Sequence, residues 1–472
     1  MDEALRQDFV ALVGAKNAAV SAEDQAPHLK EWRGRWTGTT PLVLKPASTD
    51  EVAAIVKLAH ETGTAIVPQG GNTGLVGGQI PDSSGNQIIL SLTRMSRIRA
   101  IDTDAMTLTA DAGAILQHVQ DYADDHDVFF PLSLAAKGSA TIGGNLSTNA
   151  GGVGALAHGV ARDLCLGLEV VLANGDVLDD LNRLKKNNTG YDLRNLFIGA
   201  EGTLGIITAA VLKLAPKPKA RATAFVGLNS PDDALKLLRY AQAKAGPALT
   251  AFEIMPRFGV AITVKHMPLV RDPLEDAHPW YVLLEISSLE GADHADGLMQ
   301  QILEEGLETG LIKDGTVAAN GAQRDSLWAL REGMSESQIP EGGSLKHDIS
   351  VPVSQLPPFM KAAEALVLEW EPAARICAFG HLGDGNLHYN ISQPVGADRA
   401  DFLSRVGEIT PRLHDLVMNY DGAVSAEHGI GQMKRDALTR YKSPVALETM
   451  RAIKSSLDPK GIMNPGKVLP DR

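Results

Sequence analysis

The chain has 472 residues, too many for one ordinary hydrophobic core, so two or three domains are expected. A hydrophobic content of 44% and a charged content of 21% are typical of a soluble globular protein. The net charge of −13 disfavours nucleic acid as a partner, and an anionic substrate would need a local cluster of Arg and Lys.

Targeting signals are not evident in the sequence. No apolar run approaches the roughly 18–20 residues that span a bilayer, so no transmembrane segment is expected. The start, MDEALRQDFV, has no basic n-region or apolar h-region, and its acidic residues are unlike those of a transit peptide. Cys165 and Cys377 are too few for a disulfide framework. We therefore expect a cytoplasmic protein.

Strand and helix patterns alternate from about residue 40 to 215. STDEVAAIVKLAHETG (48–63) predicts a helix with a Ser48 or Thr49 cap, and a short strand follows it. GAILQHVQDYADDHD (113–127) predicts a second helix. LGLEVVLANGDVLDD (166–180) predicts a hairpin that turns at Asn-Gly.

A change of pattern follows at KLAPKPKARA (213–222), where two prolines and four basic residues indicate a linker. A second strand and helix series then runs to about residue 424. The chain is therefore predicted to be α+β with two domains, residues 1–217 and 218–424, and a C-terminal segment, 425–472, that returns to the first domain.

Three glycine-rich clusters occur in the first domain: PQGGNTGLVGG (68–78), KGSATIGGNLSTNAGG (137–152) and NNTGYDLRNLFIGAEGTLGIIT (187–208). Consecutive glycines let backbone N–H groups turn toward an anion. The first cluster is neither a P-loop, since no Gly-Lys-Ser/Thr follows, nor the spaced Rossmann fingerprint. Together the three clusters favour a large phosphate-bearing cofactor over three ordinary structural turns.

Two histidines lie symmetrically in HLGDGNLHYN (381–390). A two-residue turn at Asp384-Gly385 would place His381 opposite His388, with their Cβ atoms roughly 4.5–5.5 Å apart. Two imidazoles at this separation can share a metal ion, although a hairpin with two half-exposed histidines is the simpler alternative.

A carboxylate and a third imidazole follow in AEH (426–428). His381, His388 and Glu427 would form a three-ligand set with an open position, as in catalytic zinc sites. Mn, Co or Fe also suits such a set. His428 is the candidate general base because imidazole titrates near neutral pH.

Cationic side chains for an anionic substrate occur in WALREGMSESQIPEGGSLKHDISVPV (328–353). Arg331 and Ser335 would share one helix face, although a solvated pair of Arg331 with Glu332 is an alternative. An alternating strand follows, with Lys346, Asp348 and Ser350 on one side.

These motifs carry a resemblance to a known family. The glycine-rich clusters resemble the FAD-binding domain of the vanillyl-alcohol oxidase (PCMH-type) flavoproteins. FGHLGDGNLHYN, SAEHGIGQMKRDAL and LDPKGIMNPGKVLP resemble the C-terminal part of FAD-linked D-2-hydroxyacid dehydrogenases. Within that family, the sequence most resembles the branch that acts on D-2-hydroxyglutarate, followed by the branch that acts on D-lactate. The resemblance implies a PCMH-type FAD-binding domain followed by an α+β substrate (cap) domain with an antiparallel sheet, which carries the metal hairpin.

The resemblance also assigns residues. It implies non-covalent FAD, because the first cluster has no histidine at which the flavin could attach. The pyrophosphate lies against Pro68, Gly70, Gly71, Asn72, Thr73, Gly74, Gly77 and Gly78. The rest of FAD is lined by Gly138, Ser139, Gly143, Gly144, Asn145, Asn149, Glu201, Gly202, Ile207 and Asn464. The metal ligands are again His381, His388 and Glu427. The substrate is bound by Arg331, Ser335 (Thr in the family), Lys346 and Asn390, and Lys346 is associated with a second substrate carboxylate.

The activity implied is oxidation of a D-2-hydroxyacid, with D-2-hydroxyglutarate to 2-oxoglutarate first and D-lactate, glycolate or another D-2-hydroxyacid as alternatives. A divalent metal, Zn²⁺ or for example Mn²⁺, would polarise the hydroxyl while His428 takes its proton. An electron-transferring flavoprotein or a quinone would accept the electrons, and a homodimer is left open. A zinc hydrolase and a cofactor-retaining binding protein are alternatives from other classes; flavin absorption and its bleaching by substrate would distinguish them.

Overall fold

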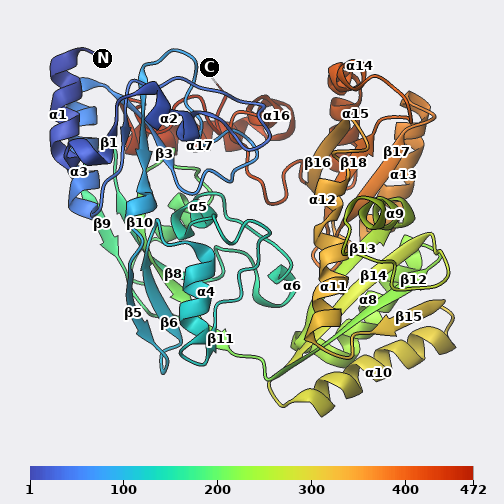
Figure 1. Cartoon of the computed structure of the whole chain (residues 1–472). Helices are drawn as coiled ribbons and strands as arrows, with labels where there is room; N and C mark the ends of the chain where they lie inside the picture. The colour runs from blue at the N-terminus through green and yellow to red at the C-terminus, as the bar shows by residue number, and fades with distance from the viewer. Residues whose placement is uncertain (471–472) are drawn as a thin grey trace. The chain divides into compact units, whose positions relative to one another are not determined.

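The computed structural model describes residues 1–470, which divide into two compact units. Unit 1 comprises residues 1–151, 159–217 and 427 onward, and unit 2 comprises residues 152–158 and 218–426. Figure 1 labels the elements of both. The division assigns the short helix α6 (Ala155–His158) to unit 2, although the sequence around it reads as part of the first domain.

A mixed four-stranded sheet with the order β1-β2-β4-β3 forms one part of unit 1. Its strands are β1 (Ala18–Ala19), β2 (Val43–Leu44), β3 (Ala65–Gln69) and β4 (Gln87–Ser91), and β3 runs parallel to β4. The helices of this part are α1 (Glu3–Val13), α2 (Ala22–Leu29) and α3 (Thr49–Thr62). The predicted helix is confirmed as α3: Ser48 caps it, and Gly63 ends it in the left-handed conformation.

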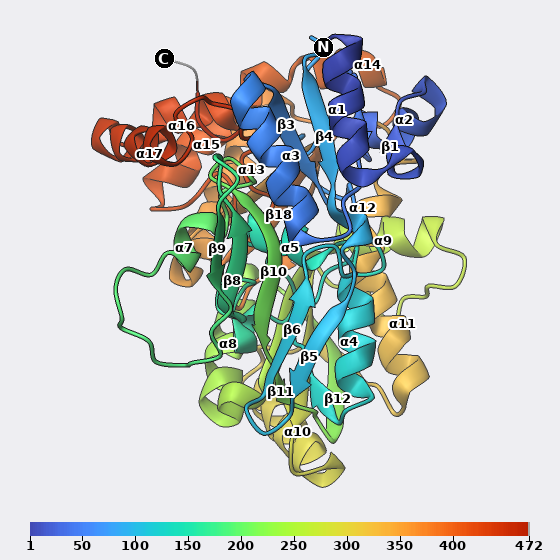
Figure 2. The ribbon, with the colours of Figure 1, turned by 90° about the vertical axis from the view of Figure 1, so that its left-hand side faces the viewer.

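A five-stranded antiparallel sheet forms the second part of unit 1, and Figure 2 shows its strands side by side from β9 to β5. The strands are β5 (Ile98–Asp102), β6 (Thr107–Asp111), β10 (Ile206–Lys213), β8 (Cys165–Val171) and β9 (Val177–Asp180). The predicted Asn-Gly hairpin is confirmed as β8–β9, with Gly175 at a φ of 88°. The second predicted helix is α4 (Leu116–Asp124). Two shorter helices, α5 (Ile142–Ser147) and α7 (Arg194–Phe197), also belong to unit 1.

The C-terminal segment completes unit 1 with α16 (Arg435–Tyr441) and α17 (Pro444–Leu457). Its last part pairs with β3, because the Ile66 amide donates to the Ile462 carbonyl oxygen and the Asn464 amide donates to that of Ile66. The turn after α17 is closed by Asp458, whose buried carboxylate accepts the amides of Ile462 (3.0 Å) and Met463 (2.8 Å).

The stretch 213–222 is not an open linker. It contains β11 (Ala215–Pro216), which pairs with β7 (Val128–Phe129), and the first residues of β12 (Ala220–Leu228). The alternation of small apolar residues from Ala220 onward carries the chain directly into the sheet of unit 2, which the prolines and basic residues had obscured.

Unit 2 is built on a seven-stranded antiparallel sheet with the order β15-β12-β14-β13-β17-β18-β16. The other strands are β13 (Leu249–Pro256), β14 (Trp280–Ser288), β15 (Asp314–Val317), β16 (Ser344–Ser350), β17 (Arg375–His381) and β18 (Asn386–Ser392). Among residues 1–470, no helix combines the length and the apolar composition needed to cross a bilayer.

Helices pack on both faces of this sheet. α8 (Pro231–Ala245) and α10 (Ala292–Glu308) contact β12, β13 and β14 on one face. α9 (Arg257–His266), α11 (Gly321–Glu332) and α12 (Met334–Ser337) lie on the other, where their apolar side chains join one core with Phe225, Met255 and Phe379. The remaining helices are α13 (Leu356–Trp370), α14 (Arg399–Ser404) and α15 (Val406–Asn419). The face that carries α11 is the one on which the candidate site lies.

Replacing Asp458 with Ala should destabilise the protein by about 2–4 kcal/mol, because it leaves two buried amides without an acceptor and Lys454 without its ion pair. Urea denaturation measures this change. Asp436→Ala is the control, since that carboxylate is 94% exposed and should matter by less than about 0.5 kcal/mol. A loss at Asp458 as small as that of the control would contradict this role of the turn.

Candidate active site

The three glycine-rich clusters converge in unit 1. The first follows the carboxyl end of β3, where ligands commonly bind to parallel strands. A Cβ atom on Gly71 would collide with the Ser139 carbonyl of the second cluster, and one on Gly202 would collide with the Pro68 ring. Glycine at these two positions therefore permits the first cluster to touch both others.

A groove of about 280 Å³ lies along these clusters. Most of the predicted cofactor residues line it: Pro68, Gly70, Gly71, Asn72, Thr73, Gly74, Gly78, Gly143, Gly144, Asn145, Glu201, Gly202 and Ile207. Five others lie outside the lining: Gly77, Gly138, Ser139, Asn149 and Asn464. Sequence reasoning missed the lining residues Gln79 and Thr141, whose polar side chains carry no glycine signal.

The groove offers hydrogen-bond donors that the protein itself does not use. Within residues 1–470, no backbone or side-chain acceptor is found for the amides of residues 71–78. Asn145 adds a buried side-chain Nδ2 without a partner. Buried donors are usually paired, so this set fits a ligand with a diphosphate and polar ring edges, such as FAD.

Glu201 joins the third cluster to the segment that follows His428. Its carboxylate accepts the amides of Ile430 (2.7 Å) and Gly431 (2.9 Å). Burial raises the pKa of Glu201 to about 7, although these hydrogen bonds and the positive charges of Lys434 and Lys467 oppose the change. The Asn464 side chain donates to the Glu201 and Gly78 carbonyl oxygens, so it holds the clusters together from outside the groove.

In unit 2 the register of three strands puts the predicted substrate and metal residues on one face. His388 of β18 pairs with Asp348 of β16, and Asn390 pairs with Lys346. Directly opposed residues of an antiparallel pair point to the same side, and so do residues two apart on one strand. These four side chains therefore share the face that also carries Phe379, the β17 partner of His388.

The predicted register of the histidine hairpin is wrong by two residues. His388 pairs with Phe379 rather than with His381, and residues 382–385 form the loop. A two-residue type I′ turn needs positive φ at both central positions. Gly385 has a φ of 88°, but Asp384 is not among the residues with positive φ. A shift of two preserves the face, so the rings of His381 and His388 still lie 5.8 Å apart.

Arg331 is buried, which excludes the alternative of a solvated pair with Glu332. Its Nε donates to Glu253 Oε2 at 2.7 Å, and its guanidinium lies 4.8 Å from the centre of the Phe379 ring. The other oxygen of Glu253 lies 2.7 Å from His381 Nδ1. Burial alone would raise the pKa of Glu253, but His381 and Arg331 outweigh it and hold the pKa at about 2. Sequence reasoning missed Glu253 entirely.

Lys346 lies near the end of the helix that carries Ser335. Its Nζ donates to the Ser335 carbonyl oxygen at 3.0 Å, so the ammonium is directed toward α12. The Ser335 residue itself is exposed. The structure thus places the Lys346 ammonium beside the backbone, rather than the hydroxyl, of the predicted partner residue.

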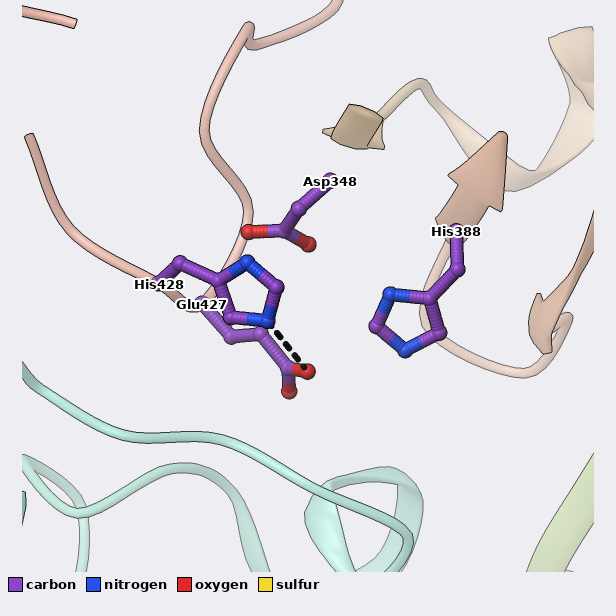
Figure 3. Close-up of side chains that lie close together, drawn as sticks. All are labelled: Asp348, His388, Glu427 and His428. Carbon is purple, nitrogen blue, oxygen red and sulfur yellow. Dashed lines mark ion pairs between the residues drawn. The ribbon is translucent and has the colours of Figure 1, made fainter. Parts of the chain in front are cut away.

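A group of possible metal ligands lies where the chain leaves unit 2. Asp348, His388, Glu427 and His428 each have a ligand atom within 4.8 Å of the others, and Figure 3 shows their side chains turned toward one another. The Ala426 amide donates to the Asp348 carbonyl oxygen at 3.4 Å, so local chain connectivity brings the next two residues here.

This group differs in part from the predicted ligand set. His388 and Glu427 belong to it, whereas His381 does not, and the predicted base His428 lies 3.7 Å from Glu427. Asp348 belongs to it but was not predicted as a ligand. Its position two residues after Lys346 in an alternating strand was the available signal. Two imidazoles and two carboxylates are donors that suit Zn²⁺ or Mn²⁺.

Comparison with known proteins defines the class. Residues 40–180 match the FAD binding domain family, and residues 217–468 match the family of FAD linked oxidases, C-terminal domain. The structure is also similar to p-cresol methylhydroxylase with substrate bound (TM-score 0.74, 19% identity, covering 99% of this chain and 96% of the other). The fold is therefore the expected α+β PCMH-type fold, and the chain is an FAD-dependent oxidoreductase.

Relatives narrow the class further. The chain is 40% identical over 441 residues to the mitochondrial D-2-hydroxyglutarate dehydrogenase of Danio rerio, covering 93% of this chain and 80% of the relative. It is 36% identical over 439 residues to D-2-hydroxyglutarate dehydrogenase of Xanthomonas citri pv. viticola, covering 93% and 91%. The chain belongs to the D-2-hydroxyglutarate dehydrogenase family.

The buried carboxyl of Glu201 should make stability depend on pH. Its pKa is about 7 in the folded protein and 4.5 ordinarily, so the folded state holds a proton that the unfolded state has released between these values. Stability should therefore fall as pH rises from 5 to 7.5, by up to about 3 kcal/mol more than in Glu201→Gln. Urea denaturation of the flavin-free protein measures the difference. A difference that does not change with pH would contradict the raised pKa.

Proposed function

We propose that this enzyme oxidises D-2-hydroxyglutarate to 2-oxoglutarate. The observation that carries the proposal is the presence of two cationic side chains, Arg331 and Lys346, on or against one face of the unit 2 sheet. D-lactate and glycolate have one carboxylate, which one cation can bind, whereas D-2-hydroxyglutarate has two. The names of the Danio and Xanthomonas relatives support the same substrate.

FAD would bind non-covalently in the groove of unit 1, with its pyrophosphate at the unpaired amides of residues 71–78. His381, His388 and Glu427 would hold a divalent metal. His388 and Glu427 belong to the group of possible ligands described above, and the His381 ring lies 5.8 Å from that of His388. When bound, FAD supplies the two-electron oxidant and the metal supplies a Lewis acid for the substrate hydroxyl.

The remaining predicted residues would bind the substrate and accept its proton. Arg331, rigid against Phe379 and Glu253, would bind the carboxylate next to the reacting carbon. Lys346 and Ser335 would bind the distal carboxylate, and Asn390 would donate to the substrate from the same sheet face. His428 would accept the proton of the hydroxyl as the carbon loses its hydride.

The matched domains are those of FAD-dependent oxidoreductases. A zinc hydrolase and a binding protein without turnover, the two alternatives from other classes, are inconsistent with these domains. The electron acceptor would be an electron-transferring flavoprotein or a quinone, and a homodimer is left open. A cytoplasmic location stays a prediction, since the Danio relative is named as mitochondrial and the Xanthomonas name gives no compartment.

Lys346→Met should lower kcat/KM for D-2-hydroxyglutarate about 10–100-fold, because hydrogen bonds to charged groups contribute about 1.5–3 kcal/mol. The same change should affect D-lactate far less, since its methyl group offers the ammonium nothing to bind. Steady-state kinetics with both acids give the comparison. Lys361→Met, at an exposed position of α13, is the matched control and should change neither.

Equal losses on both acids after Lys346→Met would show that the lysine acts on the fold rather than on a second carboxylate. A wild-type enzyme that prefers D-lactate would contradict the proposed substrate directly.

A further inference from the structure

We propose that Glu253 is the positioning residue that prepares His381 for the metal and Arg331 for the substrate. The inference rests on the proposed function, because it concerns how one buried carboxylate orients two of the residues assigned to it. Glu253 itself would contact neither the substrate nor the metal.

Glu253, on β13, joins His381 of β17 to Arg331 of α11. β13 meets β17 at two residue pairs, Glu253 with His381 and Ile254 with Gly380. The Glu253 side chain therefore lies beside His381 on the same face of the sheet. Its two oxygens each lie 2.7 Å from a nitrogen, one from His381 Nδ1 and the other from Arg331 Nε. The carboxylate is 1% exposed, so both contacts are shielded from water.

The contact with Glu253 determines which ring nitrogen of His381 is available to a metal. A carboxylate accepts and does not donate, so Nδ1 of His381 must carry the hydrogen. A metal bond from this residue must then be made by Nε2. Carboxylates that accept from the second nitrogen of a ligating histidine fix both its tautomer and its ring orientation, and their loss typically weakens metal binding 10–100-fold.

The second contact restricts the Arg331 guanidinium. Within the described part of the chain, Glu253 is the hydrogen-bond acceptor found for Arg331, and it takes Nε. The Phe379 ring below it restricts the plane of the guanidinium. With Nε bonded and the plane held, Nη1 and Nη2 remain to form a paired contact with a carboxylate.

Glu285 is an example of a buried carboxylate with a purely structural role. Glu285 on the adjacent strand β14 is also buried and accepts from Thr223 and from Trp328 Nε1 of the same helix, α11. That carboxylate joins helix to sheet without contacting any residue of the proposed site. Glu253 and Glu285 thus form a natural pair for comparison, with equal chemistry but different neighbours.

The test is Zn²⁺ binding to the FAD-loaded protein after removal of metal, measured by competition with a chromophoric chelator. Glu253→Gln should weaken Zn²⁺ binding 10–100-fold, because the neutral amide has one acceptor oxygen and cannot accept from both His381 Nδ1 and Arg331 Nε. Glu285→Gln should leave the affinity within about threefold of wild type. Flavin content and circular dichroism report whether each variant is folded.

Glu253→Asp provides the second variant in case the glutamine variant does not fold. It keeps the charge, but the shorter side chain cannot reach both partners, so Zn²⁺ binding or the KM for D-2-hydroxyglutarate should still worsen about tenfold or more. Wild-type affinity and KM in both folded Glu253 variants, or equal weakening in Glu285→Gln, would overturn the role of Glu253. A wild-type protein that binds no Zn²⁺ would instead overturn the proposed metal site itself.

Discussion

In the sheet of unit 2, Phe379, His388 and Asp348 lie opposite one another across β17, β18 and β16. This register is the constraint on which the candidate site depends. A slip of one residue in β18 would turn His388 and Asn390 to the opposite face, away from Lys346 and Asp348. The chemistry therefore requires a fixed pairing of backbone strands as much as it requires particular side chains.

Buried carboxylates near this face have ion-pair or hydrogen-bond partners. Glu253 is held between Arg331 and His381, and Asp348 accepts from the Asn386 side chain. Ionised groups removed from water need such partners, and breaking one pair leaves the other charge uncompensated. In unit 1 the buried Glu201 carboxyl has backbone amides as partners instead, and burial raises its pKa to about 7. Buried carboxyl groups thus hold strands, a helix and loops in place near both predicted sites.

Local sequence signals predicted the elements that depend on local physics. Ser48 and Gly63 bracket α3, and Gly175 turns the β8–β9 hairpin, because caps and tight turns are determined by neighbouring residues. The predicted register of the histidine hairpin was wrong by two residues, because a two-residue turn would need a positive φ at Asp384. Glu253 could not be found at all: it lies 128 residues from His381 in sequence, and only the pairing of β13 with β17 brings them together.

The proposed function requires that D-2-hydroxyglutarate transfers its electrons to FAD. The most direct test is anaerobic titration of the purified, metal-loaded enzyme with D-2-hydroxyglutarate, followed by flavin absorbance. One equivalent of the D acid should bleach the flavin. L-2-hydroxyglutarate should leave the flavin oxidised, and so should the D acid after prior removal of the metal. Flavin that stays oxidised with the D acid, or bleaches equally with both enantiomers, would contradict the proposed function.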